Sequence, residues 1–347
     1  MESSKVCITG VSGFLGAWVL KTFLEAEEKF SVRATVRDPN NPEKMKPLEE
    51  SLGDLYHNIE FVAADLNDAE SIDKAIEGCE YVIHTASPFP IAPPANEDDL
   101  IRPAVDGTKA VLEACKKHKV KKLVVTSSIA AVTDYSRDVD GATCTEDHWL
   151  EDFDNSTAYP KSKALAERSI WDFIEKLDEE EKFNVVTINP GFILGPLLTK
   201  SKCSSADVLS NILQGTYPGL PHVYTNLIDV RDVAEAHLRA ITKNAPFGRY
   251  ICTQDLYEFS FMGETLNEEF GQYGYRPNVK KLYYFVAWLA SFVMPEAKAV
   301  IGQWGIQVKT SNQKIKNNMD MEFRDMKDTI KEMGYSLIEQ GFVEDKR

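Results

Sequence analysis

The chain has 347 residues, 43% of them hydrophobic, and a formal net charge of −15 at pH 7. A chain of this length and composition can bury a large core, which excludes an intrinsically disordered protein. The negative charge repels phosphate, so neither nucleic acid nor an anionic membrane surface is expected as the main partner. Any phosphate site must therefore be locally basic.

The six cysteines form no Cys-x-x-Cys pair, which favours reduced thiols and no bound metal. The first residues are polar and lead directly into an apolar run, so no signal peptide is expected and the default location is cytoplasmic. The most apolar window, residues 283–294, is shorter than the roughly 20 residues that span a bilayer. We predict a buried helix there and leave peripheral membrane contact open.

The segment Lys5–Gly16, KVCITGVSGFLG, combines a buried strand, a glycine turn and a helix that starts at Phe14. Gly10 permits the tight turn, Gly13 lets a pyrophosphate approach the backbone, and Gly16 lets the helix pack closely on a sheet. Free N–H groups at the helix N-terminus would face the phosphates. The spacing predicts a dinucleotide site, although three glycines this close also fit a plain tight turn.

Apolar runs and amphipathic stretches alternate through the rest of the first half. After the first helix we expect a strand at residues 30–36 and a loop at 38–47. Further strands are expected at 59–63, 81–84 and 122–126, separated by helices at 69–76 and 97–118. Such alternation predicts an α/β fold, a Rossmann-type doubly wound parallel sheet with helices on both faces. The carboxyl ends of the strands then share one edge, where ligands bind.

Arg37 follows the second predicted strand, where a dinucleotide site places either an acid for a ribose 2′-hydroxyl or an arginine for a 2′-phosphate. A guanidinium binds phosphate through paired, charge-assisted hydrogen bonds, and Lys44 and Arg33 would add positive charge. We therefore predict NADPH as the cofactor. Asp38 leaves NADH as an alternative, and the arginines also fit solvated residues at a strand edge.

Tyr159 and Lys163 lie four residues apart at the start of a predicted amphipathic helix. An ammonium within about 4–6 Å lowers the pKa of a tyrosine by about 1 to 3 units, so we expect Lys163 to adjust Tyr159 as a proton donor. Thr126-Ser127-Ser128 ends a strand at the same edge, and alternation lets only one serine face the site. We choose Ser128 to bind the carbonyl oxygen of a substrate.

The second half supplies a predicted substrate-binding lobe. Strands are expected at residues 183–189, 227–230 and 249–252, helices after 231 and at 260–272, and a closing segment at 319–342. We predict that residues 1–190, with 225–245 contributing, form the Rossmann domain, and that 191–347 mainly form the smaller C-terminal lobe. The Ser-, Gly- and Pro-rich residues 197–224 are typical of a loop that closes over a substrate. The predicted pocket residues are Phe89, Thr133, Tyr217 and Tyr224.

Eight segments resemble the extended short-chain dehydrogenases/reductases, in the dihydroflavonol-reductase-like branch. They are TGVSGFLG, VRATVRDP, AADL, HTASPF, VVTSSIAAV, YPKSK, NPGFILGP and LIDVRDVAEAHL. The fourth, fifth and eighth are most similar to methylglyoxal-type carbonyl reductases. The resemblance implies NADPH-dependent reduction of an aldehyde or ketone, in which Ser128 polarises the carbonyl, Tyr159 donates the proton and Lys163 also binds the nicotinamide ribose.

The resemblance also implies a set of cofactor contacts, from the pyrophosphate and 2′-phosphate to the adenine, ribose and nicotinamide. Besides Tyr159 and Lys163, the implied residues are Gly10, Ser12, Gly13, Phe14, Leu15, Gly16, Arg37, Lys44, Asp65, Leu66, Thr85, Ala86, Ser87, Thr126, Pro190, Ile193 and Ser205.

Two departures from family patterns concern the substrate. Dihydroflavonol reductases commonly carry an asparagine where this chain has Thr133, and cinnamoyl-CoA reductases carry an NWYCYGK-like segment where it has NSTAYPKSK. We therefore expect a small or medium, largely apolar carbonyl substrate, with the enzyme a monomer or homodimer. The alternatives are a 3β-hydroxysteroid dehydrogenase-like enzyme that uses NAD, a dihydroflavonol 4-reductase and a non-catalytic NADP-binding sensor.

Overall fold

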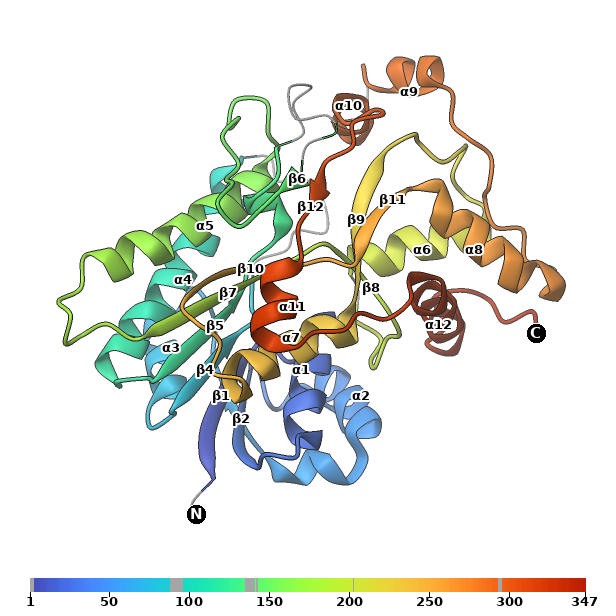
Figure 1. Cartoon of the computed structure of the whole chain (residues 1–347). Coiled ribbons are helices and arrows are strands. Elements are labelled where there is room, and N and C mark those ends of the chain that lie inside the picture. Colours follow the sequence, from blue (N-terminus) through green and yellow to red (C-terminus); the bar gives the residue numbers. More distant parts are fainter. Residues whose placement is uncertain (1–2, 88–95, 135–140, 142, 202, 293–294) are drawn as a thin grey trace.

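A seven-stranded sheet forms the centre of the protein in the computed structural model, which describes residues 3–87, 96–134, 141, 143–201, 203–292 and 295–347 (Figure 1). The strand order is β10-β7-β5-β4-β1-β2-β3, and every neighbouring pair is parallel. The strands are β1 (Ser4–Thr9), β2 (Phe30–Val36), β3 (Ile59–Ala63), β4 (Tyr81–His84), β5 (Lys122–Thr126), β7 (Asn184–Pro190) and β10 (Gly248–Cys252). The predicted Rossmann-type sheet is confirmed.

Helices cover both faces of this sheet because its central strands are apolar on both sides. Val6, Cys7 and Ile8 of β1 are each 0% exposed. One core cluster joins β1 and β2 to α1 (Phe14–Glu25), α2 (Pro42–Leu52), α7 (Val230–Thr242) and α11 (Gln313–Met319). A second cluster joins the sheet to α3 (Ala69–Ile76), α4 (Asp98–Lys117) and α5 (Ala158–Glu175). Because every strand of the sheet runs parallel to its neighbours, the carboxyl ends of the strands lie at one edge.

A smaller unit lies beside the sheet, at the right of Figure 1. Its core is a third apolar cluster. Its elements are β8 (Phe192–Leu194), β9 (Tyr224–Asp229), β11 (Asp255–Glu258), α6 (Ser204–Gln214), α8 (Ser260–Phe270) and α12 (Met326–Glu339). The remaining elements are β6 (Thr143–Cys144), β12 (Lys309–Thr310), α9 (Tyr284–Ala290), α10 (Pro295–Gly302) and the 3₁₀ turns at Gly53–Asn58, Ile129–Ala131 and Gly271–Tyr273.

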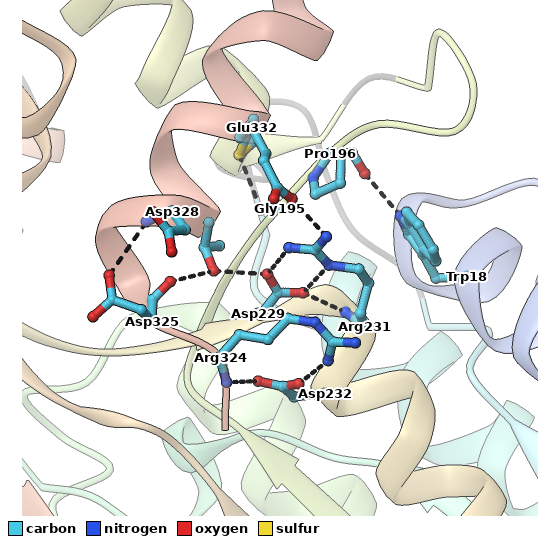
Figure 2. A network of polar contacts seen from close by, with 12 residues as sticks. Trp18, Gly195, Pro196, Asp229, Arg231, Asp232, Arg324, Asp325, Asp328 and Glu332 are labelled. Carbon is cyan, nitrogen blue, oxygen red and sulfur yellow. Dashed lines mark hydrogen bonds and ion pairs between the residues drawn. The ribbon is translucent and has the colours of Figure 1, made fainter. Parts of the chain in front are cut away.

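Polar contacts connect this unit to the central layer at the start of α7 (Figure 2). Asp229 is the N-cap of α7 and accepts hydrogen bonds from the Arg231 main-chain N at 2.7 Å and the Thr329 hydroxyl of α12 at 2.7 Å. Asp232, 1% exposed, accepts from the Arg324 main-chain N at 2.8 Å and pairs with its guanidinium. The start of α12 is therefore held against α7 by buried carboxylates.

The chain after β8 is held from two sides. The Trp18 indole of α1 donates to the Pro196 carbonyl at 2.7 Å, and the Gly195 N–H lies 3.3 Å from the Met333 sulfur of α12 (Figure 2). β8, which carries Ile193, follows directly from the carboxyl end of β7, and these contacts hold the chain that leaves it.

Two loop predictions are wrong. Residues 38–47 include the start of α2, where the Asn41 side chain accepts from the Glu43 N–H at 3.0 Å and Pro42 occupies the first helical turn. Residues 197–224 include α6, whose apolar face packs into the small unit. Asparagine followed by proline is a helix-start pattern, which the polar composition of the segment obscured.

The helix prediction at residues 283–294 is correct in type and wrong in burial. Within α9 and its N-cap, Tyr283 is 80% and Phe285 63% exposed, whereas Ala287 is 2% exposed. The helix contacts the rest of the protein along a narrow line, so most of its aromatic side chains face solvent. No helix in the described part of the chain is long and apolar enough to cross a membrane.

Candidate active site

The turn after β1 has the close backbone approach that a dinucleotide needs. Gly10 has φ +76, and a Cβ there would lie 2.9 Å from the Ala86 backbone. A Cβ on Gly16 would lie 2.1 Å from the Gly10 carbonyl oxygen, so any side chain would push α1 away from the turn. Gly13 is the N-cap of α1 and provides no capping side chain. The first N–H groups of α1 therefore remain available to an anion.

A cavity of about 600 Å³ opens beside this turn at the carboxyl edge of the sheet, within the size range of cofactor sites. Nine of the predicted cofactor residues line it: Gly10, Ser12, Gly13, Arg37, Asp65, Leu66, Thr85, Ala86 and Ser87. The sequence reasoning missed the other lining residues, namely Thr9, Val36, Ala64, Ile72, Thr35, Asn67, Asp99, Leu100 and Pro103. The last three come from the start of α4, and nothing in their spacing marked them beforehand.

Arg37 is the exposed cation of this cavity, and it makes no ion pair within the described ranges. Arg33 does not join it, which corrects our expectation, because its guanidinium donates to the Ala75 carbonyl at 2.9 Å and pairs with Glu60 at 3.0 Å. Lys44 is exposed in the first turn of α2. The Asp38 carboxylate accepts from the Asn40 N–H at 2.9 Å, within its own turn.

Ser128, Tyr159 and Lys163 lie together at the end of β5 and the start of α5. Tyr159 is hydrogen-bonded to the Ser128 side chain, whose oxygen also accepts from the Ala130 N–H at 3.1 Å. The Lys163 ammonium lies 5.9 Å from the centre of the Tyr159 ring and donates to the Ser87 hydroxyl at 3.0 Å. The three polar groups thus meet next to a residue of the cofactor cavity.

Burial determines the pKa values of this group. It raises the pKa of Tyr159 above its ordinary value, while the Ser128 hydrogen bond lowers that pKa in part. Burial also lowers the pKa of Lys163 to about 8, and the charge of Glu167 acts in the opposite direction. Our expectation that Lys163 brings the pKa of Tyr159 down towards neutrality is wrong for this structure: the pKa of Tyr159 is raised, because removal from water penalises the phenolate.

The two other residues of the Thr126-Ser127-Ser128 segment have partners behind the site. The Ser127 hydroxyl donates to Glu167 at 2.6 Å, so Ser127 and Ser128 make different contacts, as strand alternation predicts. The Thr126 hydroxyl lies 2.8 Å from His237 Nε2, while Nδ1 of that ring lies 2.7 Å from the Val233 carbonyl. Nδ1 therefore donates and Nε2 accepts from Thr126, in agreement with a pKa that burial lowers to about 4.

The predicted substrate residues lie on separate elements. Thr133 is 2% exposed and its hydroxyl donates to the Ile129 carbonyl at 2.9 Å, so this hydroxyl is already engaged. Tyr217 packs against the core of the small unit, and Tyr224 begins β9 with its ring 5.4 Å from that of His222. Phe89 lies outside the described residues.

Three predicted cofactor residues lie farther along the chain. Pro190 is the buried last residue of β7, and Ile193 packs in β8 against the central core. Ser205 is 4% exposed at the start of α6, with its hydroxyl 3.4 Å from the Cys203 sulfur. The contacts of Pro190 and Ile193 to a nicotinamide, and that of Ser205 to the cofactor, stay predictions.

The sequence reasoning also missed a buried ion pair behind the site. Glu167 follows Lys163 by four residues on α5, and its carboxylate pairs with the Arg249 guanidinium of β10 at 2.7 Å. The helical spacing from Tyr159 through Lys163 to Glu167 was a usable signal. Its partner Arg249 had none, because it is 82 positions away in the sequence.

Comparison with known proteins places this chain among reductases. The family model for the 3-beta hydroxysteroid dehydrogenase/isomerase family matches residues 7–246. Cinnamoyl-CoA reductase CAD2 of Medicago truncatula is 31% identical over 343 residues, which cover 97% of each protein.

Two solved structures share the fold over nearly the whole chain. The yeast methylglyoxal/isovaleraldehyde reductase Gre2 complexed with NADPH has a TM-score of 0.79 at 26% identity, covering 96% of this chain and 98% of Gre2. Vestitone reductase from alfalfa (Medicago sativa L.) has a TM-score of 0.75 at 25% identity, covering 98% of this chain and 100% of that enzyme.

Proposed function

Because the chain belongs to the 3-beta hydroxysteroid dehydrogenase/isomerase family, within the extended short-chain dehydrogenases/reductases, we propose that it reduces an aldehyde or ketone to the alcohol with NADPH. The observation that carries this proposal is the contact of Ser128, Tyr159 and Lys163 beside a cofactor-sized cavity. A non-catalytic sensor needs the cavity but has no use for the three polar groups. The substrate we propose is small or medium and largely apolar.

The glycine turn and Arg37 support NADPH as the cofactor. At Gly10 and Gly16 the backbone packs so closely on neighbouring backbone that a Cβ would clash, as in a tight dinucleotide-binding turn. The Arg37 guanidinium, which makes no ion pair within the described residues, suits a 2′-phosphate. Asp38, which would favour NADH, is hydrogen-bonded within its own turn. The solved structure of the relative Gre2 is a complex with NADPH. Arg37 and, farther out, Lys44 are the residues that would hold the 2′-phosphate.

The proposed chemistry divides between cofactor and protein. Bound NADPH supplies the hydride. A carbonyl oxygen that enters between the hydroxyls of Ser128 and Tyr159 replaces their mutual hydrogen bond and accepts one from each. Burial keeps Tyr159 protonated at neutral pH, so it can give its proton to the alkoxide. The Lys163 ammonium, next to Ser87, stabilises the negative charge left on the tyrosine oxygen.

We infer that the smaller unit binds the rest of the substrate. β8 continues directly from the carboxyl end of β7, which pairs with β5, so it begins beside the catalytic strand end. Contacts from α1 and α12 hold the chain after β8 in place (Figure 2).

The test is NADPH consumption by the purified full-length chain with a panel of apolar aldehydes, diketones, flavonoids, steroids and a cinnamoyl thioester. We expect turnover with the aldehydes or ketones. Tyr159→Phe should bind NADPH normally, measured by cofactor fluorescence, and lose at least about 100-fold in turnover, because general-acid catalysis contributes about 10²- to 10⁴-fold.

Other outcomes of the panel would contradict the proposal. Near-normal turnover by Tyr159→Phe would remove this residue as the acid. Activity restricted to steroids with a preference for NADH would instead identify a steroid dehydrogenase, and turnover of flavonoids alone would identify a dihydroflavonol reductase. No oxidation of NADPH with any carbonyl, together with tight NADPH binding, would identify a sensor.

A further inference from the structure

We propose that Glu167 is a positioning residue of the reaction: its carboxylate holds the Ser128 strand end in place and keeps the neighbouring Lys163 in its charged form. Lys163 and Ser128 act on a carbonyl only in the proposed reductase, so this role of Glu167 rests on the proposed function.

Glu167 is the centre of a buried polar network that joins four elements. Its side chain is 0% exposed and pairs with Arg249 Nε of β10 at 2.7 Å. It also accepts hydrogen bonds from the Ser127 hydroxyl after β5 at 2.6 Å, the Asn189 amide of β7 at 2.7 Å and the Thr187 hydroxyl of β7 at 2.9 Å. Four donors thus satisfy one carboxylate of α5, which compensates for its removal from water.

The same network reaches the backbone that carries Ser128. The Asn189 amide, besides binding Glu167, lies within hydrogen-bonding distance of the Ser128 carbonyl at 3.2 Å. The Arg249 guanidinium donates to the Ala131 carbonyl at 3.3 Å, and its Cζ lies 3.6 Å from the centre of the Trp149 ring. The carboxylate therefore fixes the peptide on which the proposed carbonyl-binding hydroxyl is mounted.

Glu167 and Lys163 also line the same small cavity. A cavity of about 20 Å³ between α5, α4 and the strand ends is lined by both residues, together with Ser87, Thr126 and Ser127. The negative charge of the Glu167 carboxylate favours the charged, ammonium form of the nearby Lys163. Burial alone lowers the pKa of Lys163, and Glu167 opposes that effect.

Few other charges act on Lys163 in the described part of the chain. From β4 comes His84, which is 3% exposed and whose pKa burial and Lys163 together lower to about 4, so it is neutral. From α5 comes Tyr159, which is protonated at neutral pH. From β10 comes Arg249, which pairs with Glu167 and is not among the groups that shift the pKa of Lys163. From α4, the cavity is lined by Ala104 and Thr108, which carry no charge.

The experiment measures the titration of Lys163 without turnover and then the pH profile of turnover. Lysine is labelled with ¹³C at Cε, and the signal of Lys163 is identified by its loss in Lys163→Met. In the wild type we expect a midpoint near pH 8. In Glu167→Gln we expect a midpoint lower by about 1 unit, as for loss of one nearby opposite charge.

The pH profile of turnover should follow the same shift. A decrease of about 1 unit leaves about one eleventh of Lys163 protonated at pH 8 instead of one half, so kcat at that pH should fall about fivefold. Glu167→Asp, which keeps the charge, should restore the Lys163 midpoint towards the wild-type value. Asp232→Asn removes another buried carboxylate, which pairs with Arg324, and should leave both the Lys163 midpoint and the pH profile unchanged.

An unchanged Lys163 midpoint in a folded Glu167→Gln protein overturns the proposal. Glu167→Gln leaves Arg249 as an unpaired buried cation, which can prevent folding. In that case the Lys163 midpoint is measured in the double variant Glu167→Gln with Arg249→Met, which removes both charges. A wild type that turns over no carbonyl contradicts the proposed function instead, while the titration still decides whether Glu167 keeps Lys163 charged.

Discussion

Arg37 is the residue on which the choice of cofactor depends. Its guanidinium is exposed at the end of β2, lines the large cavity and has no partner in the described ranges. Replacing it in Arg37→Ser should raise the Kd for NADPH about 10- to 150-fold, the factor that corresponds to a charged hydrogen-bonding pair of about 1.5–3 kcal/mol. Titration with NADPH and, separately, with NADH measures this effect.

The Kd for NADH should change less than about threefold in Arg37→Ser, because NADH lacks the 2′-phosphate. Lys46→Ser is a matched control, since Lys46 is an exposed cation on the adjacent helix α2 that pairs loosely with Glu50. An equal loss of affinity for both cofactors would show that Arg37 supports the fold of the turn and does not select the phosphate.

At the scale of elements, the contact between α1 and the turn before it determines whether the cavity forms. A Cβ on Gly16 would lie 2.1 Å from the Gly10 carbonyl oxygen. This oxygen belongs to the backbone, so it cannot move aside as the end of a flexible side chain can. Gly16→Ala should therefore shift α1 and weaken NADPH binding at least about tenfold, with a loss of stability of about 1–3 kcal/mol, the usual cost of overpacking. Calorimetric titration and thermal unfolding measure the two effects.

Gly302 provides the comparison for this substitution. It lies at the exposed end of α10, and a Cβ there would meet nothing within 4 Å. Gly302→Ala should leave NADPH binding unchanged and alter stability by no more than about 0.5 kcal/mol. Wild-type affinity in Gly16→Ala would mean that the turn adapts, and that close packing of α1 is not required for the cofactor.

The elements also show why two helix starts were missed. α2 and α6 lie in segments rich in Pro, Ser, Gly or charged residues, and their apolar positions become visible only against the surfaces on which they pack. Tertiary packing supplies most of the stability of such short helices, so local composition underestimates them.

At the scale of the whole molecule, apolar residues contribute to stability according to where the fold places them. Phe270 is 0% exposed and packs on the Tyr335 ring at 4.8 Å, whereas Phe285 of α9 is 63% exposed. Phe270→Ala should cost about 3–5 kcal/mol, the range for large-to-small changes in a core. Phe285→Ala should change stability by no more than about 0.5 kcal/mol.

Chemical denaturation of the two variants beside the wild type measures this difference. Equal losses of stability would mean that α9 is packed against the protein in solution, as the sequence prediction had it. A loss confined to Phe270→Ala would agree with the exposed α9 of this structure.

The sequence by itself determined the parallel sheet, the glycine turn and the pairing of Tyr159 with Lys163, because each depends on local spacing: alternating apolar runs, glycines three apart, or two residues one helical turn apart. Ser128 was expected beside them for a different reason, because the carboxyl ends of parallel strands share one edge of a sheet. The tertiary structure decided the burial of charges. Arg33 pairs with Glu60 and Glu167 pairs with Arg249 because the sheet brings distant strands together. The raised pKa of Tyr159 and the exposure of α9 likewise depend on packing by many elements at once, which no local pattern encodes.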